Sequence, residues 1–479
     1  MQMPLIWRKI EERKYLLLTL VVIAGFFIAK LPYLHLPFFW DEAWVYGPAV
    51  RLMANTNLSI MPDALPVGLS RGHPLLFHFL NAAWIRIFGD SLVVIHLFNL
   101  LIACALVFAI YLFGKYLFSE RVGFASAFIF CLQPVFLAQS TLVLPETMLA
   151  LFSLVALYGY LKNNYFIYFI FASAAVLTKE TGIAVILACE ILTLINGFKD
   201  AKANFWHFVL KITKMALPLI PLMAFLIIQF FTHGWFLFSE HVNFVSFDIS
   251  IIYKKLIKGY LTFGFIVQGR NLLFYFALVA VAWLIYRKKK LENKHAVIAL
   301  VVFILVYSLI GAVNFLTKRY MLSIIPPIIL MSTGIILQTY KNRYVLLVIL
   351  CIFSFAQVKY INQKTNCDHN LGFVNILKAD QCMIDYCLEN NLKDEKFAVF
   401  FIGNVIMTIP YAGFVEGDEV FTNICANPEE AEYYIITNYD TNEQFTSYRS
   451  DERLVLLKQF QLGDARTELY KKKSNYHDN

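Results

Sequence analysis

The sequence predicts an α-helical polytopic membrane protein of about eleven transmembrane helices, followed by a small C-terminal α/β domain. Three observations support this fold class. Hydrophobic residues make up 59% of the 479 positions and charged residues only 15%, whereas soluble domains carry about 25% charged residues. Apolar stretches of roughly 17–25 residues follow one another up to residue 359. Beyond residue 360 the composition becomes more polar, and short strand-like runs replace the long apolar stretches.

The basic residues have the distribution that membrane topology demands. The net charge of +8 requires no nucleic-acid partner, because the lysines and arginines gather in short loops between the apolar stretches. Four basic residues precede the first apolar stretch, namely Arg8, Lys9, Arg13 and Lys14. Since positive residues stay in the cytoplasm, we expect the segment after this stretch to lie outside. No small-residue cleavage site follows it, so we expect a retained span rather than a signal peptide.

The apolar stretches give the predicted elements in order. We expect a first span over 15–32, a surface helix over 42–54 and a polar loop over 55–72. Residues 75–88 are expected to form a second surface helix or the start of a span. The later spans are expected near 92–113, 122–139, 145–161, 165–178, 181–197, 208–231, 271–286, 296–315, 320–338 and 343–359. This odd number places the C-terminal domain outside the cytoplasm, and the compact loops are typical of a bacterial inner (plasma) membrane protein.

The chain is expected to divide into a membrane domain over residues 1–359 and an outer α/β domain over 360–479. In the second domain we expect a helix over 379–390. Strand-like runs occupy 397–402, 433–436 and 454–457. Four cysteines lie in or beside this domain, namely Cys367, Cys382, Cys387 and Cys425. An oxidising outer compartment would permit disulfides among them, and free buried thiols are the alternative.

Two adjacent carboxylates stand between the first span and the first surface helix. Asp41 and Glu42 lie in the run P-F-F-W-D-E-A-W-V-Y over residues 37–46. Aromatic rings favour the membrane–water interface, whereas a charge buried near hydrocarbon costs several kcal/mol unless something compensates it. The pattern therefore predicts an acidic site held at the outer membrane surface. A helix N-terminus, with Asp41 as its cap and Glu42 in its first turn, is a compatible structural alternative.

Further polar side chains gather on the predicted outer side. They come from nearly every outer loop and comprise Arg71, His73, Gln139, Glu146, Lys179, Glu180, His233, Glu240, His241, Arg270, Lys318 and Arg319. Carboxylates, histidines and cations that converge on one face of an apolar bundle suggest that an anionic substrate is handled at the outer leaflet. Single residues have simpler explanations. Glu146 could face a helix dipole, Lys179 could form a loop ion pair with Glu180, and a lone His241 is more often a satisfied interfacial histidine.

Five segments of the chain resemble one family in their order and placement. They are F-W-D-E-A-W-V-Y, R-G-H-P-L-L-F, L-P-E-T-M-L-A-L-F, L-T-K-E-T-G and F-S-E-H-V-N-F. Their acidic pair, His-Pro segment, second acidic position, Leu-Thr-Lys turn and Glu-His segment resemble those of GT-C type membrane glycosyltransferases. The resemblance is to bacterial members of the protein O-mannosyltransferase and lipid A aminoarabinose transferase group, and it covers about residues 10–340.

The resemblance implies an inverting transfer of a sugar from a polyprenyl-phosphate donor to an extracytoplasmic acceptor, a lipid, glycan or protein hydroxyl. Carried over residue by residue, Asp41 is the general base, and Glu42 and Glu146 orient the acceptor or hold Asp41. Inversion needs a base opposite the leaving group and no covalent intermediate. Cations must stabilise the leaving phosphate, and the implied set is Arg71, His73, Lys179 and Arg319.

The resemblance also implies a possible divalent metal, with His241 as a ligand. Here the chain departs from the aminoarabinose transferases, because Gly72 stands where they carry a metal-binding glutamate and His73 where they carry a phosphate-binding lysine. His241 would then lack its co-ligand, which leaves metal use open.

Two other kinds of function compete with the enzyme. A transporter or flippase for a lipid-linked anion would place polar residues at mid-membrane depth and would show an internal repeat. We find no repeat, and the charged residues gather at one mouth of the bundle, which favours the enzyme. A structural subunit would not explain why Asp41, Glu42 and Glu146 occur together.

Overall fold

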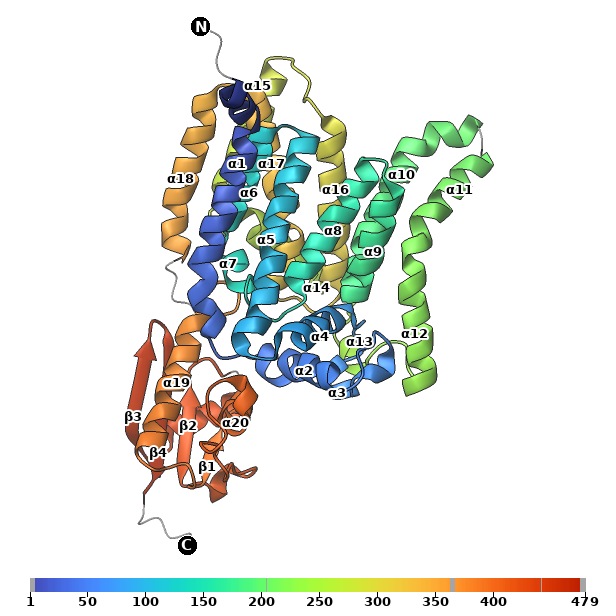
Figure 1. Cartoon of the computed structure of the whole chain (residues 1–479). Helices are drawn as coiled ribbons and strands as arrows, with labels where there is room; N and C mark the ends of the chain where they lie inside the picture. Colours follow the sequence, from blue (N-terminus) through green and yellow to red (C-terminus); the bar gives the residue numbers. More distant parts are fainter. Residues whose placement is uncertain (1–4, 204, 362–366, 441, 474–479) are drawn as a thin grey trace.

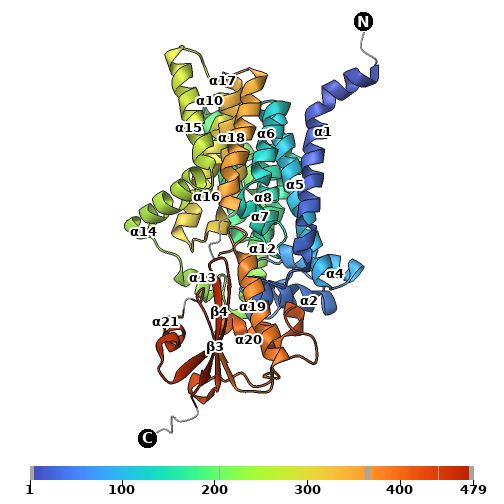
Figure 2. The same cartoon turned by 90° about the vertical axis from the view of Figure 1, so that its left-hand side faces the viewer.

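The computed structural model describes residues 5–203, 205–361, 367–440 and 442–473. It consists of a bundle of long helices, a layer of short helices at one end of the bundle, and a small α/β domain beyond that layer (Figure 1). The view turned by 90° shows the same three parts in the same order, with the N-terminus at the end of the bundle opposite the domain (Figure 2). The predicted fold class, a helical membrane protein with a small C-terminal α/β domain, is confirmed.

Helices occupy every range predicted as a span. The bundle contains α1 (Leu5–Lys30), α5 (Leu92–Leu117), α6 (Glu120–Cys131), α7 (Pro134–Gln139), α8 (Glu146–Leu161), α9 (Tyr165–Thr178), α10 (Ile183–Ala203), α11 (Phe205–Ala216), α12 (Ile220–His233), α15 (Arg270–Tyr286), α16 (Lys294–Val313), α17 (Ile325–Thr339) and α18 (Arg343–Ile361). Several of these helices have a short polar side chain as their N-cap. Ser91, for example, accepts a hydrogen bond from the N–H of Val94 at the start of α5, as an N-cap does.

Fewer helices qualify as membrane spans by length than the sequence predicts. Among the described residues, six are long and apolar enough to cross a membrane, or seven if the bent pair Ile249–Ile266 and Arg270–Tyr286 is one span. Shorter apolar helices, among them Glu146–Leu161 and Tyr165–Thr178, fill other predicted ranges. The count of about eleven therefore includes helices shorter than the roughly 20 residues that a full crossing needs.

The end layer carries the predicted surface helices. It contains η1 (Leu31–His35), η2 (Glu42–Tyr46), α2 (Gly47–Asn55), η3 (Pro62–Ala64), α3 (Val67–Ser70), α4 (Leu76–Phe88), α13 (Ser239–Asn243), α14 (Ile249–Lys254), η6 (Lys255–Ile266) and η7 (Lys318–Ser323). Helices are thus present over 42–54 and 75–88, as predicted. The segment 55–72 is mostly loop but includes two short turns of helix that the sequence did not indicate.

The C-terminal domain is a four-stranded sheet in the order β1-β2-β4-β3. Its elements are α19 (Phe373–Glu389), β1 (Phe397–Val399), α20 (Phe401–Thr408), η8 (Pro410–Ala412), η9 (Pro428–Glu430), β2 (Tyr433–Thr437), α21 (Glu443–Thr446), η10 (Ser447–Ser450), β3 (Leu454–Leu462) and β4 (Ala465–Lys472). Strand β1 is parallel to β2, and β4 is antiparallel to both β2 and β3. Figure 2 shows α19 beside this sheet.

Three details of this domain differ from the sequence-based prediction. The strand expected over 397–402 ends at Val399, because the chain turns into α20 at Phe401. The helix expected over 379–390 begins earlier, at Phe373. Strand β4 was missed because its sequence A-R-T-E-L-Y-K-K is polar and lacks a run of β-branched residues. No disulfide links the described cysteines.

The C-terminal domain packs directly on the end layer. The N–H of Phe38 donates to the carbonyl of Ala412 (2.9 Å), and the Arg51 guanidinium donates to the carbonyl of Tyr411 (2.8 Å). One hydrophobic core runs through both parts and contains Phe38 together with Phe373. The stretch that carries the acidic pair therefore lies between the bundle and the domain. The domain boundary at residue 360 stays a prediction.

Candidate active site

The two adjacent carboxylates point to different surroundings. Glu42 is fully buried and accepts hydrogen bonds from the backbone N–H groups of Phe39 (2.9 Å) and Val143 (2.5 Å). Its Oε1 also lies 3.4 Å from Nε2 of His96. Glu42 therefore ties the acidic stretch to the segment before α8 and does not line the cavity described below. Asp41 precedes η2 but its side chain makes no capping hydrogen bond, so the simple helix-cap alternative is wrong for Asp41.

Asp41 is held by one arginine and one tryptophan. Its Oδ1 lies 3.3 Å from the indole nitrogen of Trp44, and its Oδ2 accepts a hydrogen bond from Nη2 of Arg319. Nη1 of the same arginine donates to Asp368 at 2.7 Å, and its Nε lies 3.8 Å from Glu146. Burial alone would lower the pKa of Arg319, but the carboxylates of Asp41, Asp368 and Glu146 hold that pKa well above its ordinary value.

A second ion pair lies behind the first. Lys179, in the break between α9 and α10, donates to Oε1 of Glu146 at 3.0 Å, and both side chains are buried. The Lys179 ammonium also lies 3.6 Å from the ring centroid of Tyr320, within cation–π range. Glu146 stands at the N-terminus of α8, directly after Pro145. The loop ion pair expected between Lys179 and Glu180 is therefore replaced by a pair with Glu146.

Histidines and a further arginine form the other half of the site. Nδ1 of His73 lies 2.9 Å from Glu180, and the rings of His73 and His241 are 4.5 Å apart between centroids. Arg71 pairs with Glu240 at 2.5 Å. Burial, together with the nearby His73, lowers the pKa of His241 to about 4. At neutral pH His241 is therefore an uncharged hydrogen-bonding group.

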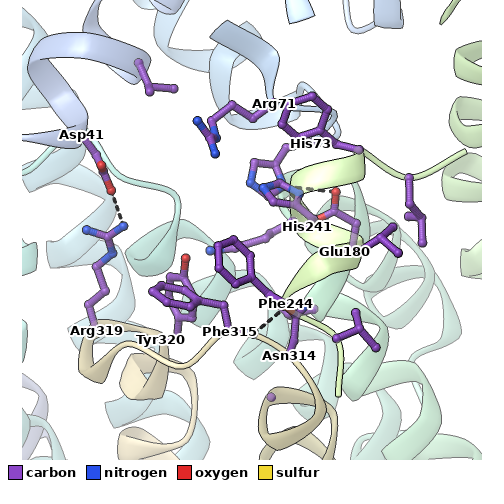
Figure 3. Close-up of a pocket in the computed structure, with 18 of the residues that line it drawn as sticks. Asp41, Arg71, His73, Glu180, His241, Phe244, Asn314, Phe315, Arg319 and Tyr320 are labelled. Atoms are coloured by element: carbon purple, nitrogen blue, oxygen red, sulfur yellow. Dashed lines mark hydrogen bonds and ion pairs between the residues drawn. The ribbon is translucent and has the colours of Figure 1, made fainter. Parts of the chain in front are cut away.

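These residues surround one cavity of about 400 Å³ (Figure 3). Its polar wall is formed by Asp41, Arg71, His73, Lys179, Glu180, His241 and Arg319. Its apolar wall includes Trp44, Phe238, Phe244, Phe315 and Tyr320. Figure 3 shows Asp41 and Arg319 at one end and His73, His241 and Glu180 at the other. A mostly apolar cavity with a few convergent charged groups is typical of a small-molecule or lipid head-group site.

The structure brings together most of the predicted site residues. Asp41, Arg71, His73, Lys179, Arg319 and His241 line the cavity. Glu146 lies just outside it and contacts two of its cations, whereas Glu42 is buried behind it. Arg270 is fully buried elsewhere, where it donates to Gln133 and to backbone carbonyls. The predicted roles of these residues are not tested by their positions alone.

Sequence reasoning missed Asp368. This residue comes after the last bundle helix in the sequence and reaches the site through its ion pair with Arg319 of η7. No local pattern marks it, since a single aspartate after a span is common in an outer loop. Tyr320 was also missed, because its contact with Lys179 joins residues that lie far apart in the sequence and no spacing predicts it.

The residues present do not fit a metal ion. Within the described residues, no group of three or more histidine, cysteine, aspartate or glutamate side chains could hold one. At Gly72, where the resembling enzymes carry a metal-binding glutamate, the backbone has φ +69°, and an added Cβ would lie 2.8 Å from Cβ of Phe238. A carboxylate ligand therefore cannot be accommodated at this position without rearrangement. His241 instead stacks beside His73.

Comparisons with known proteins found one match to a family and several proteins of similar fold. Residues 72–228 match the family described as Dolichyl-phosphate-mannose-protein mannosyltransferase. No curated protein sequence matches the chain. The crystal structure of ArnT from Cupriavidus metallidurans in the apo state has a similar fold, with a TM-score of 0.54 and 11% sequence identity. The similarity covers 96% of this chain and 98% of the ArnT chain.

Two further solved structures match this chain. ArnT from the same organism bound to undecaprenyl phosphate is similar over 96% of this chain and 99% of its own, with a TM-score of 0.53 and 11% identity. The Archaeoglobus fulgidus oligosaccharyltransferase complex with Zn and sulfate has a TM-score of 0.47 and 12% identity, over 86% of this chain and 63% of its own. The last likeness is too distant to support a conclusion about this chain. The resemblance to GT-C type membrane glycosyltransferases is confirmed, and the chain has the fold of ArnT.

Proposed function

We propose that this protein is an inverting glycosyltransferase that moves a sugar from a polyprenyl-phosphate donor to a hydroxyl group of an extracytoplasmic acceptor. The observation that carries the proposal is the cavity that Asp41 shares with Arg71, His73, Lys179 and Arg319. One partly exposed carboxylate beside a set of cations provides a base and an anion site within a single cavity. The fold of ArnT supports this chemistry by analogy.

Asp41 would act as the general base. It takes the proton of the acceptor hydroxyl while the hydroxyl oxygen attacks the anomeric carbon, and the bond from that carbon to the phosphate oxygen breaks on the opposite face. The electron pair of that bond leaves with the polyprenyl phosphate. One displacement inverts the anomeric centre and leaves no covalent intermediate on the protein. Before this step Asp41 must exchange its hydrogen bond with Arg319 for one with the acceptor.

The cations would stabilise the charge that develops on the leaving phosphate. Lys179 and Arg319 are preorganised by Glu146, which pairs with the first at 3.0 Å and lies 3.8 Å from the second. Glu146 is thus proposed as a positioning residue. Glu42 would act in the same way on Asp41, through the backbone of the stretch that both residues share.

The apolar wall suits the lipid part of the donor. Phe238, Phe244 and Phe315 line the cavity, and several large apolar side chains nearby are exposed, including Phe247 and Ile249. An isoprenoid chain that leaves the lipid for these side chains exchanges one apolar surface for another, so the contact relies on van der Waals packing. This arrangement would bring the phosphate to the cavity while the chain stays in the bilayer. No step in this mechanism is routed through a metal.

Removal of the Asp41 charge tests whether this residue is the base. We expect Asp41→Asn to lose transfer of label from a mixture of polyprenyl-phosphate sugars to membrane components by about 10²–10⁴-fold, the usual contribution of a general base. The amide keeps the shape of the side chain but cannot take up the proton. Binding of the polyprenyl-phosphate donor should be retained or become tighter, because the cations that would contact the phosphate are unchanged and the carboxylate that competes for Arg319 has lost its charge.

Asp63→Asn is the matched control, because Asp63 is exposed in the same end layer. It should transfer label like the wild type. Equal activity of Asp41→Asn would show that Asp41 is not the base. If the wild type instead moves a lipid-linked sugar between leaflets without transferring it, the protein is a transporter and the enzyme proposal is wrong.

A further inference from the structure

The pair Asp368-His369, just before α19, reaches the back of the site. Four side chains from three other segments hold it. Gln139 donates to the carbonyl of Asp368 (2.8 Å), and Gln268 donates to the carbonyl of His369 (3.1 Å). Lys318 lies 3.3 Å from the His369 ring nitrogen, and Arg319 pairs with the Asp368 carboxylate at 2.7 Å. So many specific contacts on two consecutive residues indicate a fixed position.

Arg319 is divided between two carboxylates. Nη2 of Arg319 faces Asp41, which lines the cavity, and Nη1 faces Asp368, which does not. The exposed fractions of these side chains are 14% for Arg319, 22% for Asp41 and 16% for Asp368. Asp368 therefore contacts the arginine from the side away from the cavity. Asp368 is not part of the cavity wall, so its effect on a substrate would pass through Arg319.

The charges of this half of the site are unbalanced before a donor arrives. Three carboxylates, those of Asp41, Glu146 and Asp368, face only two cations, Lys179 and Arg319. A donor phosphate would add at least one more negative charge. Nη2 of Arg319 faces both the cavity and Asp41, so a phosphate that binds this nitrogen would compete with the Asp41 carboxylate for it. Asp41 lies on the cavity side, so it is the carboxylate that a phosphate would displace.

We propose that Asp368 is a positioning residue that keeps hold of Arg319 through Nη1 while Nη2 exchanges Asp41 for the donor phosphate. The exchange frees the Asp41 carboxylate at the moment the donor is in place. Without Asp368, both nitrogens of the arginine would turn to Asp41 and Glu146. The phosphate would then compete with a stronger ion pair. This inference rests on the proposed function, because it assigns a step to the same site.

The test measures transfer by Asp368→Asn, Asp368→Glu and the control Asp394→Asn, an exposed position in the same domain. We expect Asp368→Asn to lower kcat about tenfold or more, since small displacements of catalytic groups cost up to about 100-fold. The KM for the acceptor should not change. Asp368→Glu should recover part of the rate because it restores the carboxylate. Asp394→Asn should behave like the wild type.

A double-mutant cycle separates positioning from a general structural role. In an Arg319→Ala background, Asp368→Asn should cause no further loss of rate, because Asp368 acts only through that arginine. The melting temperatures of the same four proteins form a second cycle, which measures the coupling between Asp368 and Arg319 without an activity assay. Asp368→Asn should lower the melting temperature of the wild type but not that of Arg319→Ala.

The outcomes are distinguishable. If the wild type transfers no sugar from any polyprenyl-phosphate donor, the proposed function is wrong and this inference falls with it. If the wild type is active and Asp368→Asn matches Asp394→Asn, only the inference is overturned. Equal losses of rate from Asp368→Asn in both backgrounds would likewise overturn it, because Asp368 would then act independently of Arg319.

Discussion

Asp380 is a carboxylic acid inside the C-terminal domain. Its side chain is buried in α19, and its Oδ1 accepts hydrogen bonds from the hydroxyls of Tyr439 and Thr467, the second at 3.0 Å. Burial raises the pKa of Asp380 to about 7, although both hydrogen bonds act in the opposite direction. Desolvation of the carboxylate therefore outweighs the two donors.

This pKa predicts how stability depends on pH. An unfolded aspartate has a pKa of about 3.9, so between about pH 4 and 7 the folded chain holds a proton that the unfolded chain has lost. The contribution of Asp380 to the free energy of unfolding therefore falls as pH rises through this window. Asp380→Asn keeps the acceptor oxygen and removes the charge. We expect it to stabilise the protein at pH 8 by up to about 4 kcal/mol, because a shift of about three pKa units is worth about 1.4 kcal/mol for each unit, and to change little at pH 4.

Melting temperatures of the detergent-solubilised protein across this pH range would measure the effect. Asp385→Asn is the control, because Asp385 lies exposed on the same helix α19. It should leave the pH dependence of the melting temperature as it is in the wild type. If Asp380→Asn also leaves that pH dependence unchanged, Asp380 is ionised in the folded protein and the predicted linkage is wrong.

At the residue scale, the sequence predicts where charged groups gather but not which groups face the cavity. Asp41 and Glu42 are neighbours with the same chemistry, yet the first lines the cavity and the second is buried in the core, because adjacent residues at a helix start point in different directions. Lys179 could be expected near an acid, but its partner Glu146 comes from another helix. The sequence did not indicate that Asp368 belongs to the site, because Asp368 reaches it through a contact with Arg319, which is 49 residues away in the sequence.

Helices α5 and α6 meet at two glycines. A Cβ added to Gly114 would lie 2.7 Å from Cα of Gly123, and a Cβ added to Gly123 would lie 2.4 Å from the carbonyl oxygen of Tyr111. Such distances to backbone atoms leave no room for a methyl group. Small residues at helix contacts let membrane helices approach closely, which increases their van der Waals packing. The turn between these two helices depends on that approach.

We therefore expect Gly123→Ala to destabilise the protein by about 1–3 kcal/mol, the usual cost of overpacking. No predicted site residue lies in either helix, so kcat of the folded fraction should be unchanged. Gly25→Ala in α1 is the matched control, because no atom lies within 4 Å of the added Cβ. It should be neutral or slightly stabilising, since alanine is the better helix former. A melting temperature of Gly123→Ala equal to that of Gly25→Ala would contradict the tight contact.

At the element scale, apolar periodicity predicts helices well and their ends less well. Every predicted span contains a helix, and α9 (Tyr165–Thr178) has the bounds that the sequence predicts. The lengths of the helices were predicted less well than their positions. The range 122–139 is broken into α6 and α7 around Gln133 and Pro134, because proline cannot continue the preceding helix. In the C-terminal domain, strands such as β4 depend on their partners and not on their own composition.

Over the whole molecule, α13, which helps to line the cavity, lies at the same end of the bundle as the C-terminal domain (Figures 1 and 2). The domain contributes Asp368 to the site and supports the acidic stretch through Ala412 and Phe373. Its side of the membrane is therefore also the side on which any reaction takes place. The loop between α15 and α16 lies at the opposite end and carries the basic run Arg287-Lys288-Lys289-Lys290.

The positive-inside rule then fixes the expected orientation. We expect a cysteine introduced by Asp394→Cys, in a background whose exposed native cysteines are replaced by serine, to react with a membrane-impermeant maleimide in intact cells or spheroplasts. A cysteine introduced by Lys290→Cys should react only after permeabilisation, because the basic loop would face the cytoplasm. Both positions are exposed, so differences in labelling report sidedness and not burial. The reverse pattern would place Asp41 in the cytoplasm, and the acceptor would then have to be sought there.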